Sequence, residues 1–325
     1  MIVPTYWAEA RLQEKTPERQ VTVRRFGWSD ASQADAQALA DERAREALAR
    51  ILAGESKVAR RDEKIPYGGA DGMPIREEIV ERAGEMVVTR NSYGARCLNV
   101  PDVLFADIDQ GVPRGGQFGC WLAFALSASA LYFTRSWTHF ERVALVVAAC
   151  FATWAVVRAV ERWQIRRLAR QGDRVPQILR DFAASNPEWH LRLYRTPAGW
   201  RVLAMQRTFE PREPAVAEAF QAWGVDPVYA MMCWNQQCFR ARLTAKPWRI
   251  GLTEHLRPRP GVWPINPERM PDRLRWVAEY ENAAREFAAC RFVEAIGSSN
   301  TTAKTESVRA AHDRWCAAES DLPLA

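Results

Sequence analysis

An apolar run from Val103 to Ala106 leads into two carboxylates spaced two residues apart, Asp107 and Asp109. In a β-strand, residues i and i+2 point to the same face. Paired carboxylates can hold Mg²⁺ or Mn²⁺ against a phosphate, because hard cations prefer oxygen ligands. Asp107 and Asp109 are therefore candidate metal ligands. A lone Asp-x-Asp pattern is not specific, however, and the residues alone favour a strand end that turns into solvent at Gln110-Gly111.

Cysteines and histidines are the next residues that could carry chemistry. The chain has seven cysteines and four histidines. The number of cysteines is odd, they are scattered along the sequence, and a chain of this length does not need disulfides to fold. This pattern indicates a reducing compartment. Cys233 and Cys238 are the only two cysteines close together in the sequence. A zinc site at this pair is possible, but the favoured interpretation is that they are buried or free thiols. His312 and Asp313 could form a catalytic pair, but adjacent residues do not face each other on a helix, which favours a surface pair.

Length and composition describe a folded protein. The 325 residues predict one large domain or two ordinary ones. Hydrophobic residues make up 48% of the chain and charged residues 26%, which excludes global disorder. The net charge of +6 permits a nucleic-acid or anionic-membrane partner without requiring one. The N-terminal residues lack the pattern of a signal peptide, so the N-terminal part is expected in the cytoplasm.

Two apolar runs in the middle of the chain predict a membrane hairpin. Residues 115–134 contain no charged residue, and the run 118–133 within them is apolar on every helical face, which suits a membrane span. The second run, residues 143–157, is shorter and is followed by Arg158. Basic residues flank the pair on both sides, so the positive-inside tendency predicts membrane contact through residues 117–160 at a bacterial inner membrane, with both soluble parts cytoplasmic. The alternative is a buried hairpin of two helices, which the small residues of both runs also permit.

Around this hairpin, the expected elements mix strands with helices. Helices are expected at residues 36–52, 75–82, 175–184, 214–223, 227–233, 272–291 and 307–318. Strands or strand hairpins are expected at residues 21–27, 86–99, 103–109, 191–205 and 238–249. Without regular βαβ alternation, this order predicts an α+β fold with an antiparallel or mixed sheet and flanking helices, interrupted by the hydrophobic two-helix hairpin.

The same elements predict four parts of the chain. The parts are an N-terminal α+β part with the Asp-x-Asp strand (1–113), the hydrophobic hairpin (114–162), the second half of the α+β domain (163–256) and a C-terminal helical part (257–325).

Three phrases of the sequence resemble, in their order, motifs of the archaeo-eukaryotic primase superfamily. They run from Val103 to Asp109, from Tyr194 to Val202 and from Phe239 to Pro247. That family has a hydrophobic Asp-x-Asp strand, then a small-x-His motif in a hairpin, then a later acidic position. Here Arg201 stands where the histidine would be, and the late acid nearby is Asp226, in a helix-start context. The resemblance implies a palm-like fold, similar to an RRM-like sheet, over roughly residues 86–250.

What the resemblance implies chemically is metal-dependent nucleotidyl transfer. Asp107 and Asp109 would hold Mg²⁺ or Mn²⁺, and Arg201 would be the third catalytic residue. Four further basic residues would neutralise the phosphates of a nucleotide or nucleic acid: Arg240, Arg242, Lys246 and Arg249. The alternative is that the arginines pair with the Asp pair inside the fold and leave no site. The whole chain also resembles a bacterial family that shares its Arg-Asn-x-Tyr-Gly and Phe-Ala-Asp-x-Asp phrases. This resemblance does not imply any particular activity.

Three functions therefore stay open from the sequence. The first is a membrane-tethered protein whose cytoplasmic palm-like domain binds nucleotide or nucleic acid, either as a primase-polymerase-like enzyme or as a degenerate relative. The second is a membrane-anchored structural or interaction protein without catalytic activity. The third is a soluble enzyme with an apolar helical insert. An open cleft at the carboxylates would favour the first, and closed ion pairs in a filled core would favour the second.

Overall fold

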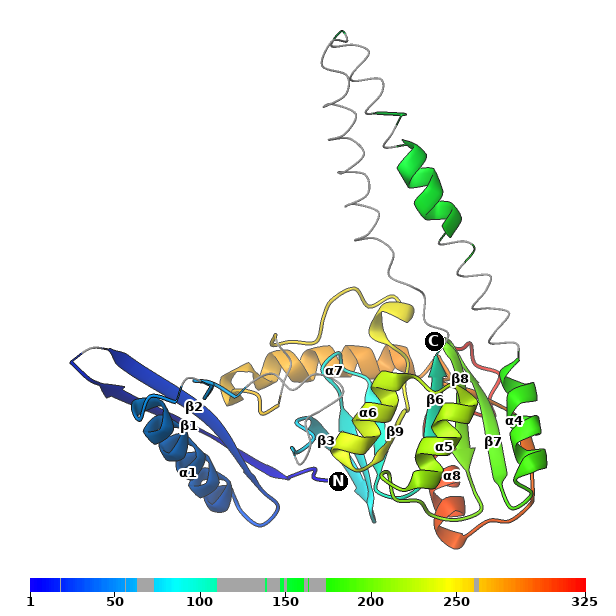
Figure 1. The fold of residues 1–325 in the computed structure, drawn as a ribbon, viewed down its shortest axis with the longest axis horizontal. Helices are drawn as coiled ribbons and strands as arrows, with labels where there is room; N and C mark the ends of the chain where they lie inside the picture. Colours follow the sequence, from blue (N-terminus) through cyan, green and yellow to red (C-terminus); the bar gives the residue numbers. More distant parts are fainter. Residues whose placement is uncertain are drawn as a thin grey trace. The chain divides into compact units, whose positions relative to one another are not determined.

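Figure 1 shows a computed structural model of the chain, which describes a set of ranges with gaps between them. These are residues 1–17, 19–55, 57–62, 73–109, 138, 147–148, 151–160, 163, 174–259 and 263–325. The chain divides into two compact units, one formed by Met1–Ile108 with Leu179–Ala325 and the other by Asp109–Ile178.

Strands and helices are mixed along the described chain, which confirms the predicted α+β class. The strands are β1 (Tyr6–Lys15), β2 (Gln20–Ser29), β3 (Glu78–Ala83), β4 (Met86–Arg90), β5 (Arg96–Val100), β6 (Phe105–Asp109), β7 (His190–Thr196), β8 (Gly199–Ala204), β9 (Phe239–Arg242) and β10 (Arg291–Gly297). The α-helices are α1 (Gln33–Leu52), α4 (Val175–Ser185), α5 (Pro214–Trp223), α6 (Pro227–Gln236), α7 (Met270–Ala284) and α8 (Ala303–Cys316). Two short 3₁₀ helices span Pro247–Arg249 and Pro267–Arg269.

The N-terminal strands β1 and β2 form an antiparallel pair against which α1 packs. The contact is built from alanines, with Ala8 and Ala10 of the sheet against Ala36 and Ala40 of the helix. Gly27 of β2 permits the close approach, because a Cβ there would lie 2.1 Å from the Ala36 carbonyl oxygen. Small side chains on both elements thus let the helix lie directly on the strands.

A second sheet has the order β3-β4-β5-β9, with antiparallel neighbours. Helix α7 contributes Trp276 and Tyr280 to the apolar cluster beside this sheet. Buried charge also joins helix and sheet, because Arg273 of α7, 1% exposed, donates to Glu78 of β3. Removing either partner of such a pair would leave a buried charge uncompensated, so the pair fixes the position of α7.

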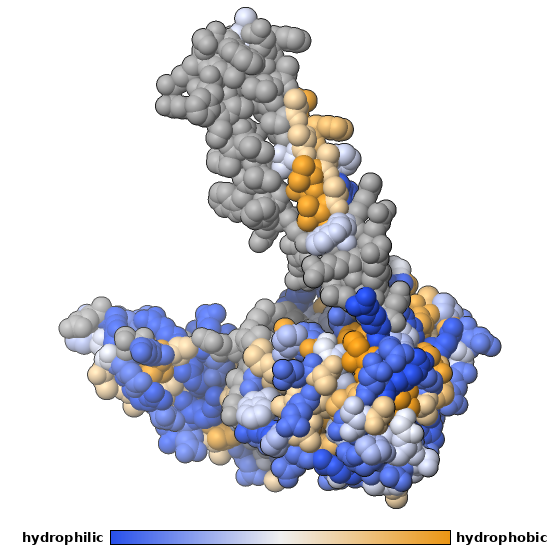
Figure 2. All heavy atoms as spheres, turned by 45° about the vertical axis from the view of Figure 1, so that its right-hand side comes forward, coloured by the Kyte–Doolittle hydropathy of each residue, from blue (hydrophilic) through white to orange (hydrophobic). Residues whose placement is uncertain are grey.

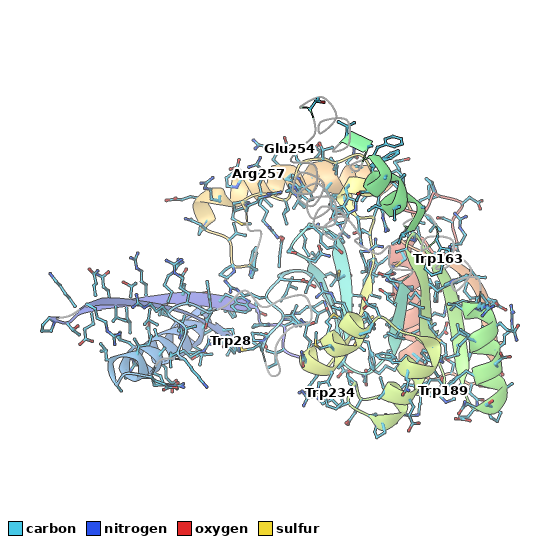
Figure 3. The ribbon with its side chains drawn as sticks, turned by 45° about the horizontal axis from the view of Figure 1, so that its top comes forward. Trp28, Trp163, Trp189, Trp234, Glu254 and Arg257 are labelled. Carbon is cyan, nitrogen blue, oxygen red and sulfur yellow. The ribbon has the colours of Figure 1, made fainter. Side chains whose placement is uncertain are left out.

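The third sheet, with the order β10-β7-β8-β6, positions the residues of greatest interest. Tyr194 and Arg201 are cross-strand partners and therefore share one face. Helix α8 covers that face, since the His312 ring centroid lies 5.0 Å from the ring of Tyr194. Trp189, labelled in Figure 3, precedes β7 and contacts Phe182 of α4 and Trp223 of α5.

Several element predictions need correction. Residues 75–82 were expected to be helical, but Glu78–Ala83 form strand β3. The helix expected over 272–291 ends at Ala284, and β10 follows it within the part that was expected to be helical. Strand β1 was missed altogether. The palm-like arrangement stays a prediction, because the observed order of strands establishes only the α+β class.

The predicted membrane hairpin is wrong. Within the ranges that the structure describes, no helix combines the length and the apolar composition needed to cross a bilayer. This finding overturns the predicted membrane tethering and the predicted place at a bacterial inner membrane. Most of residues 114–162 lie outside the described ranges. Figure 2 shows hydrophobic side chains on the helical residues 151–160, where Phe151 is 68% exposed.

Candidate functional site

Asp107, the first of the predicted metal ligands, is held by an arginine. The Arg201 guanidinium donates from Nε to Oδ1 at 2.8 Å and from Nη2 to Oδ2 at 3.3 Å. Arg201 is 1% exposed, whereas Asp109, two residues along β6, is exposed. Burial alone would lower the pKa of Arg201, but the Asp107 carboxylate, together with the sulfurs of Cys290 and Cys316, raises it above its usual value. Asp107 and Arg201, two of the three predicted catalytic residues, thus form an ion pair inside the fold, as the alternative interpretation anticipated.

The predicted phosphate-binding residues lie near one another in the chain but face different partners. Arg240 is 3% exposed and pairs with Glu77 at 2.5 Å. Arg242 donates to the Thr244 carbonyl oxygen, and Lys246 lies over the ring of Trp248. Arg240 and Arg242 share one face of β9, as the spacing predicted. Arg249 lies in the 3₁₀ helix that follows β9. Roles in phosphate binding and a Mg²⁺ or Mn²⁺ site stay predictions.

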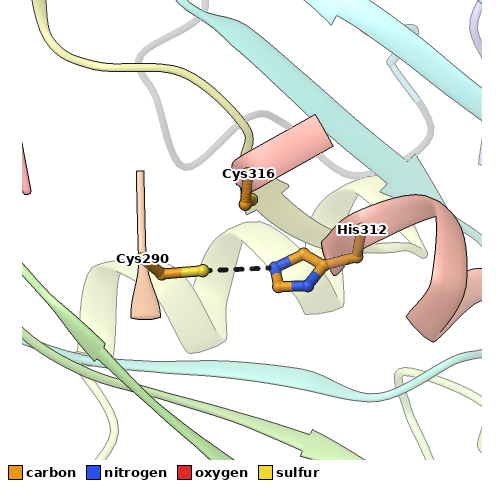
Figure 4. A group of neighbouring side chains, drawn as sticks. All are labelled: Cys290, His312 and Cys316. Atoms are coloured by element: carbon orange, nitrogen blue, oxygen red, sulfur yellow. Dashed lines mark hydrogen bonds between the residues drawn. The ribbon is translucent and has the colours of Figure 1, made fainter. Parts of the chain in front are cut away.

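A second group of side chains, which we call the thiol–imidazole cluster, consists of Cys290, His312 and Cys316 (Figure 4). Their three potential donor atoms all lie within 4.8 Å of one another, and each residue is 0% exposed. The Cys290 sulfur lies 3.9 Å from His312 Nε2. The cluster therefore gathers two thiols and an imidazole in a closed interior position.

Two segments of the C-terminal chain bring the cluster together. Cys290 lies directly before β10, and His312 and Cys316 lie one turn apart on α8, so their side chains share a helix face. The Ala289 amide donates to the Cys316 carbonyl oxygen at 3.0 Å, which joins the two segments at the cluster. A capping box at Thr302 fixes the start of α8.

The imidazole is oriented by a carboxylate. His312 Nδ1 lies 2.9 Å from Asp313 Oδ1. Asp313 is in turn held by Arg192 at 3.0 Å and by Arg309 at 3.1 Å. Both residues of the pair are buried, so the predicted surface pair at His312 and Asp313 is wrong. The side chains meet although they are adjacent in sequence, because the Asp313 carboxylate turns back to the imidazole.

Arg201 connects this cluster to Asp107. Its Nη1 lies 3.3 Å from His312 Nε2 and donates to the Arg242 carbonyl oxygen at 2.8 Å. The Cys316 sulfur lies 3.6 Å from that same carbonyl oxygen. A continuous polar path thus runs through the core from Asp107 to Asp313. Polar groups in an apolar core are costly unless each has a partner, so the path is a specific feature of this fold.

The cluster changes the proton affinities of its members in opposite directions. Hydrogen bonding from Cys316, together with the nearby His312 and Arg201, holds the pKa of the Cys290 thiol well below its usual range. Burial raises the pKa of the Cys316 thiol, and its hydrogen bond to Cys290 adds to the effect. Burial alone would lower the pKa of His312, but the Cys290 sulfur and the Asp313 carboxylate raise it. The proton affinity of each member thus depends on its neighbours in the cluster.

Sequence reasoning missed this cluster although part of its signal was present. The spacing His312-x-x-x-Cys316 places two ligand types on one helix face, a pattern that metal sites use. Cys290 carries no local signal, because only the packing of β10 against α8 brings it near. The other close thiols, Cys233 and Cys238, are also buried and free. The five described cysteines are buried and form no disulfide, while Cys120 and Cys150 lie outside the described ranges.

Comparisons with protein-family models, with curated proteins and with solved structures find no match to this chain. The resemblance to the primase superfamily therefore stays a prediction. The chemistry of the site has to be argued from its own residues.

Proposed function

We propose that this protein binds one Zn²⁺ ion through Cys290, His312 and Cys316. The observation that carries the proposal is the gathering of three donor atoms within 4.8 Å of one another in the core. Thiolate is a soft donor and imidazole a borderline one, and together they suit Zn²⁺ and disfavour Mg²⁺ or Mn²⁺. Bonds to zinc of about 2.3 Å from sulfur and about 2.0 Å from nitrogen need only a modest contraction of the cluster.

Charge balance supports a divalent ion at this position. Binding would remove the protons of Cys290 and Cys316, and two thiolates together neutralise Zn²⁺. The loaded cluster would then carry no net charge, so its burial would cost little solvation free energy. The neighbouring ion pair between Arg201 and Asp107 is also neutral and would not change.

The surroundings of His312 support its role as a ligand. Histidine ligands in metal sites usually donate their other ring nitrogen to a carboxylate, which fixes the ring and raises its basicity. Asp313 occupies that position at 2.9 Å from Nδ1 and leaves Nε2 directed towards Cys290. The hydrogen bonds from Arg192 and Arg309 in turn hold Asp313 in place.

The proposed site has a fourth possible donor and a hydrogen-bonding role for Arg201. The Arg242 carbonyl oxygen lies 3.6 Å from the Cys316 sulfur, a separation that one zinc ion can bridge with bonds of about 2.1 and 2.3 Å. Arg201 Nη1 now lies 3.3 Å from His312 Nε2. When zinc takes the Nε2 lone pair, this N–H would donate to a thiolate sulfur, a common outer contact in thiolate sites.

The proposed ion would have a structural role, because the cluster is closed to solvent. It would tie the segment before β10 to the last turn of α8 and so hold both against the sheet that carries Arg201. Closed zinc sites contribute their binding free energy directly to folding. The proposed function is therefore metal-dependent stabilisation of the C-terminal part of the fold.

The proposal is tested by metal titration of the full chain after removal of bound ions with a chelator. We expect one equivalent of Zn²⁺ to bind and the melting temperature to rise. We expect Co²⁺ to give the intense absorption of a tetrahedral thiolate site. The variant Cys316→Ser should lose these signals, and Asp313→Asn should weaken binding about 10- to 100-fold, as expected when the residue that orients a ligand is lost.

The matched control is Cys233→Ser, which removes a buried thiol outside the cluster. It should bind one equivalent of Zn²⁺ with unchanged affinity. The proposal is overturned if the wild-type chain binds no Zn²⁺, or if Cys233→Ser loses the ion while Cys316→Ser keeps it. Because Asp313→Asn retains all three donors, it tests the site even if Cys316→Ser does not fold.

A further inference from the structure

We infer that Cys290 and Cys316 form a peroxide-reactive dithiol in the metal-free protein, with Cys290 attacking and Cys316 resolving. The inference deepens the proposed function, because zinc would occupy the same sulfurs and protect them. Disulfide formation itself does not require that zinc ever binds. The two proposals can therefore fail separately.

The geometry of the two segments suits a disulfide. The two sulfurs belong to a group whose donor atoms lie within 4.8 Å of one another. The main chains beside them are already joined, since the Ala289 amide donates to the Cys316 carbonyl oxygen at 3.0 Å. Ala289 directly precedes Cys290, so the two cysteines lie on main-chain segments that are already in direct contact, as a disulfide requires.

The surroundings distinguish the two sulfurs. The Cys290 sulfur lies 3.9 Å from His312 Nε2, a ring nitrogen that can take the thiol proton as the sulfur attacks. The Cys316 sulfur lies 3.6 Å from the Arg242 carbonyl oxygen, which cannot act as a base in this way. Cys290 is therefore the nucleophile and Cys316 the second thiol.

The chemistry runs in two balanced steps with a hydroperoxide as the oxidant. The Cys290 sulfur attacks the terminal peroxide oxygen while His312 takes the thiol proton, so that an S–O bond forms and the O–O bond breaks. The alkoxide or hydroxide that leaves takes this proton from His312 and departs as an alcohol or water. Cys290 is oxidised to the sulfenic acid and the peroxide is reduced. The Cys316 sulfur then attacks Cys290, an S–S bond forms, the S–O bond breaks and the hydroxyl leaves as water with the Cys316 proton.

Burial restricts which oxidant can act. Cys290 and Cys316 are both 0% exposed, so a reagent must be about as small as water or must wait for local opening of the C-terminal segment. Hydrogen peroxide meets the first condition. A bulky hydroperoxide is expected to react more slowly with the folded protein than hydrogen peroxide does.

The test treats the full chain with hydrogen peroxide in two forms, chelator-treated and zinc-loaded. Free thiols are counted over time, and the disulfide is located by mass spectrometry of unreduced peptides. We expect the metal-free chain to form a Cys290–Cys316 disulfide about tenfold or more faster than the zinc-loaded chain does. In Cys316→Ser we expect a sulfenic acid on Cys290 that a dimedone probe captures, and in Cys290→Ser no such adduct.

Cys233 and Cys238 provide an internal control for selectivity. Both are buried, and they are joined by a backbone hydrogen bond of 3.4 Å, but no histidine joins them in a donor group within the described part of the chain. The inference is overturned if the metal-free chain forms no Cys290–Cys316 disulfide, or if Cys233 and Cys238 oxidise equally fast. A chain that forms the disulfide without binding Zn²⁺ would overturn the zinc proposal alone.

Discussion

Asp107 contributes to the stability of the fold through its ion pair with Arg201. The Arg201 side chain is 2% exposed and that of Asp107 is 26% exposed, so the ion pair lies mostly out of water. Asp107→Asn would leave the guanidinium buried without a counter-ion. We expect the free energy of unfolding to fall by about 3 kcal/mol. Urea denaturation monitored by tryptophan fluorescence measures the change.

Asp321→Asn is the control for that experiment. Asp321 is an exposed aspartate, so its substitution removes the same charge and should change the free energy of unfolding by no more than about 0.5 kcal/mol. If the two variants were equally stable, the pair with Arg201 would have no net stabilising effect. The ion-pair interpretation of Asp107 would then be wrong.

The residues of the site were only partly predictable. The shared face of Arg240 and Arg242 follows from strand periodicity, because side chains two residues apart point the same way. Asp107 was named from its place at the end of an apolar strand, and Arg201 only through the resemblance to the primase superfamily. The thiol–imidazole cluster does not follow from periodicity. Its members come from two segments that touch only after β10 pairs with β7, and sequence spacing carries no information about that contact.

Buried Cys238 predicts a loss of stability in alkaline solution. Burial raises the pKa of its thiol to about 12, whereas an unfolded cysteine titrates near about 8.5. Above about pH 8.5 the unfolded chain releases a proton that the folded chain retains, so stability is complete below that pH and falls as the pH rises towards 12. Between about pH 8.5 and 10, this thiol should lower the free energy of unfolding by about 2 kcal/mol.

The measurement compares urea unfolding of the wild type and Cys238→Ala at the two ends of that pH range. Other groups titrate alike in both proteins, so the difference between their losses isolates Cys238. The variant should lose less stability than the wild type. Equal losses would show that the thiol does not keep its proton in the folded chain.

Among the elements, the strand hairpin predicted over residues 86–99 is confirmed by the pairing of β4 with β5, and Asn91–Gly94 form its turn. The Gly94 amide donates to the Asn91 carbonyl oxygen at 2.9 Å, and Gly94 has a φ of +102°. A Cβ at this position would lie 2.4 Å from the ring of Trp276. Gly94→Ala therefore combines backbone strain with overpacking and should lower the free energy of unfolding by about 2–4 kcal/mol.

Thermal unfolding of Gly94→Ala checks this, with Ser92→Ala as the control in the same turn. Ser92 is exposed, so its substitution should be nearly neutral. A second variant that carries both Gly94→Ala and Trp276→Ala separates the two causes. If the clash with Trp276 matters, the double variant should be more stable than the sum of the single effects predicts.

Other elements escaped prediction because local propensity and tertiary pairing disagree. Residues 75–82 contain good helix formers, with Ile75 and Ile79 spaced as on one helix face. The chain is extended there because β3 pairs with β4, and because Glu77 and Glu78 reach Arg240 and Arg273. Such long-range ion pairs outweigh a propensity of a few tenths of a kcal/mol per residue.

At the scale of the molecule, the α+β class was predictable and the assembly of the sheets was not. Composition and the order of strands and helices suffice for the class. The assembly depends on individual contacts between elements far apart in sequence. One of these is the hydroxyl of Tyr229 on α6, which lies 2.9 Å from the carbonyl oxygens of both Phe105 and Arg240. It links β6 of one four-stranded sheet to β9 of the other.

Tyr229→Phe removes this link and keeps the ring. Tyr229 is 2% exposed, so water cannot replace the hydroxyl, and the free energy of unfolding should fall by about 1–3 kcal/mol. Tyr6→Phe, at a 37% exposed tyrosine, is the control and should be nearly neutral. Hydrogen exchange gives the decisive measurement, because amides of β6 and β9 should both exchange faster in Tyr229→Phe while those of β1 and β2 stay unchanged. Faster exchange in only one of the two sheets would show that the hydroxyl does not join them.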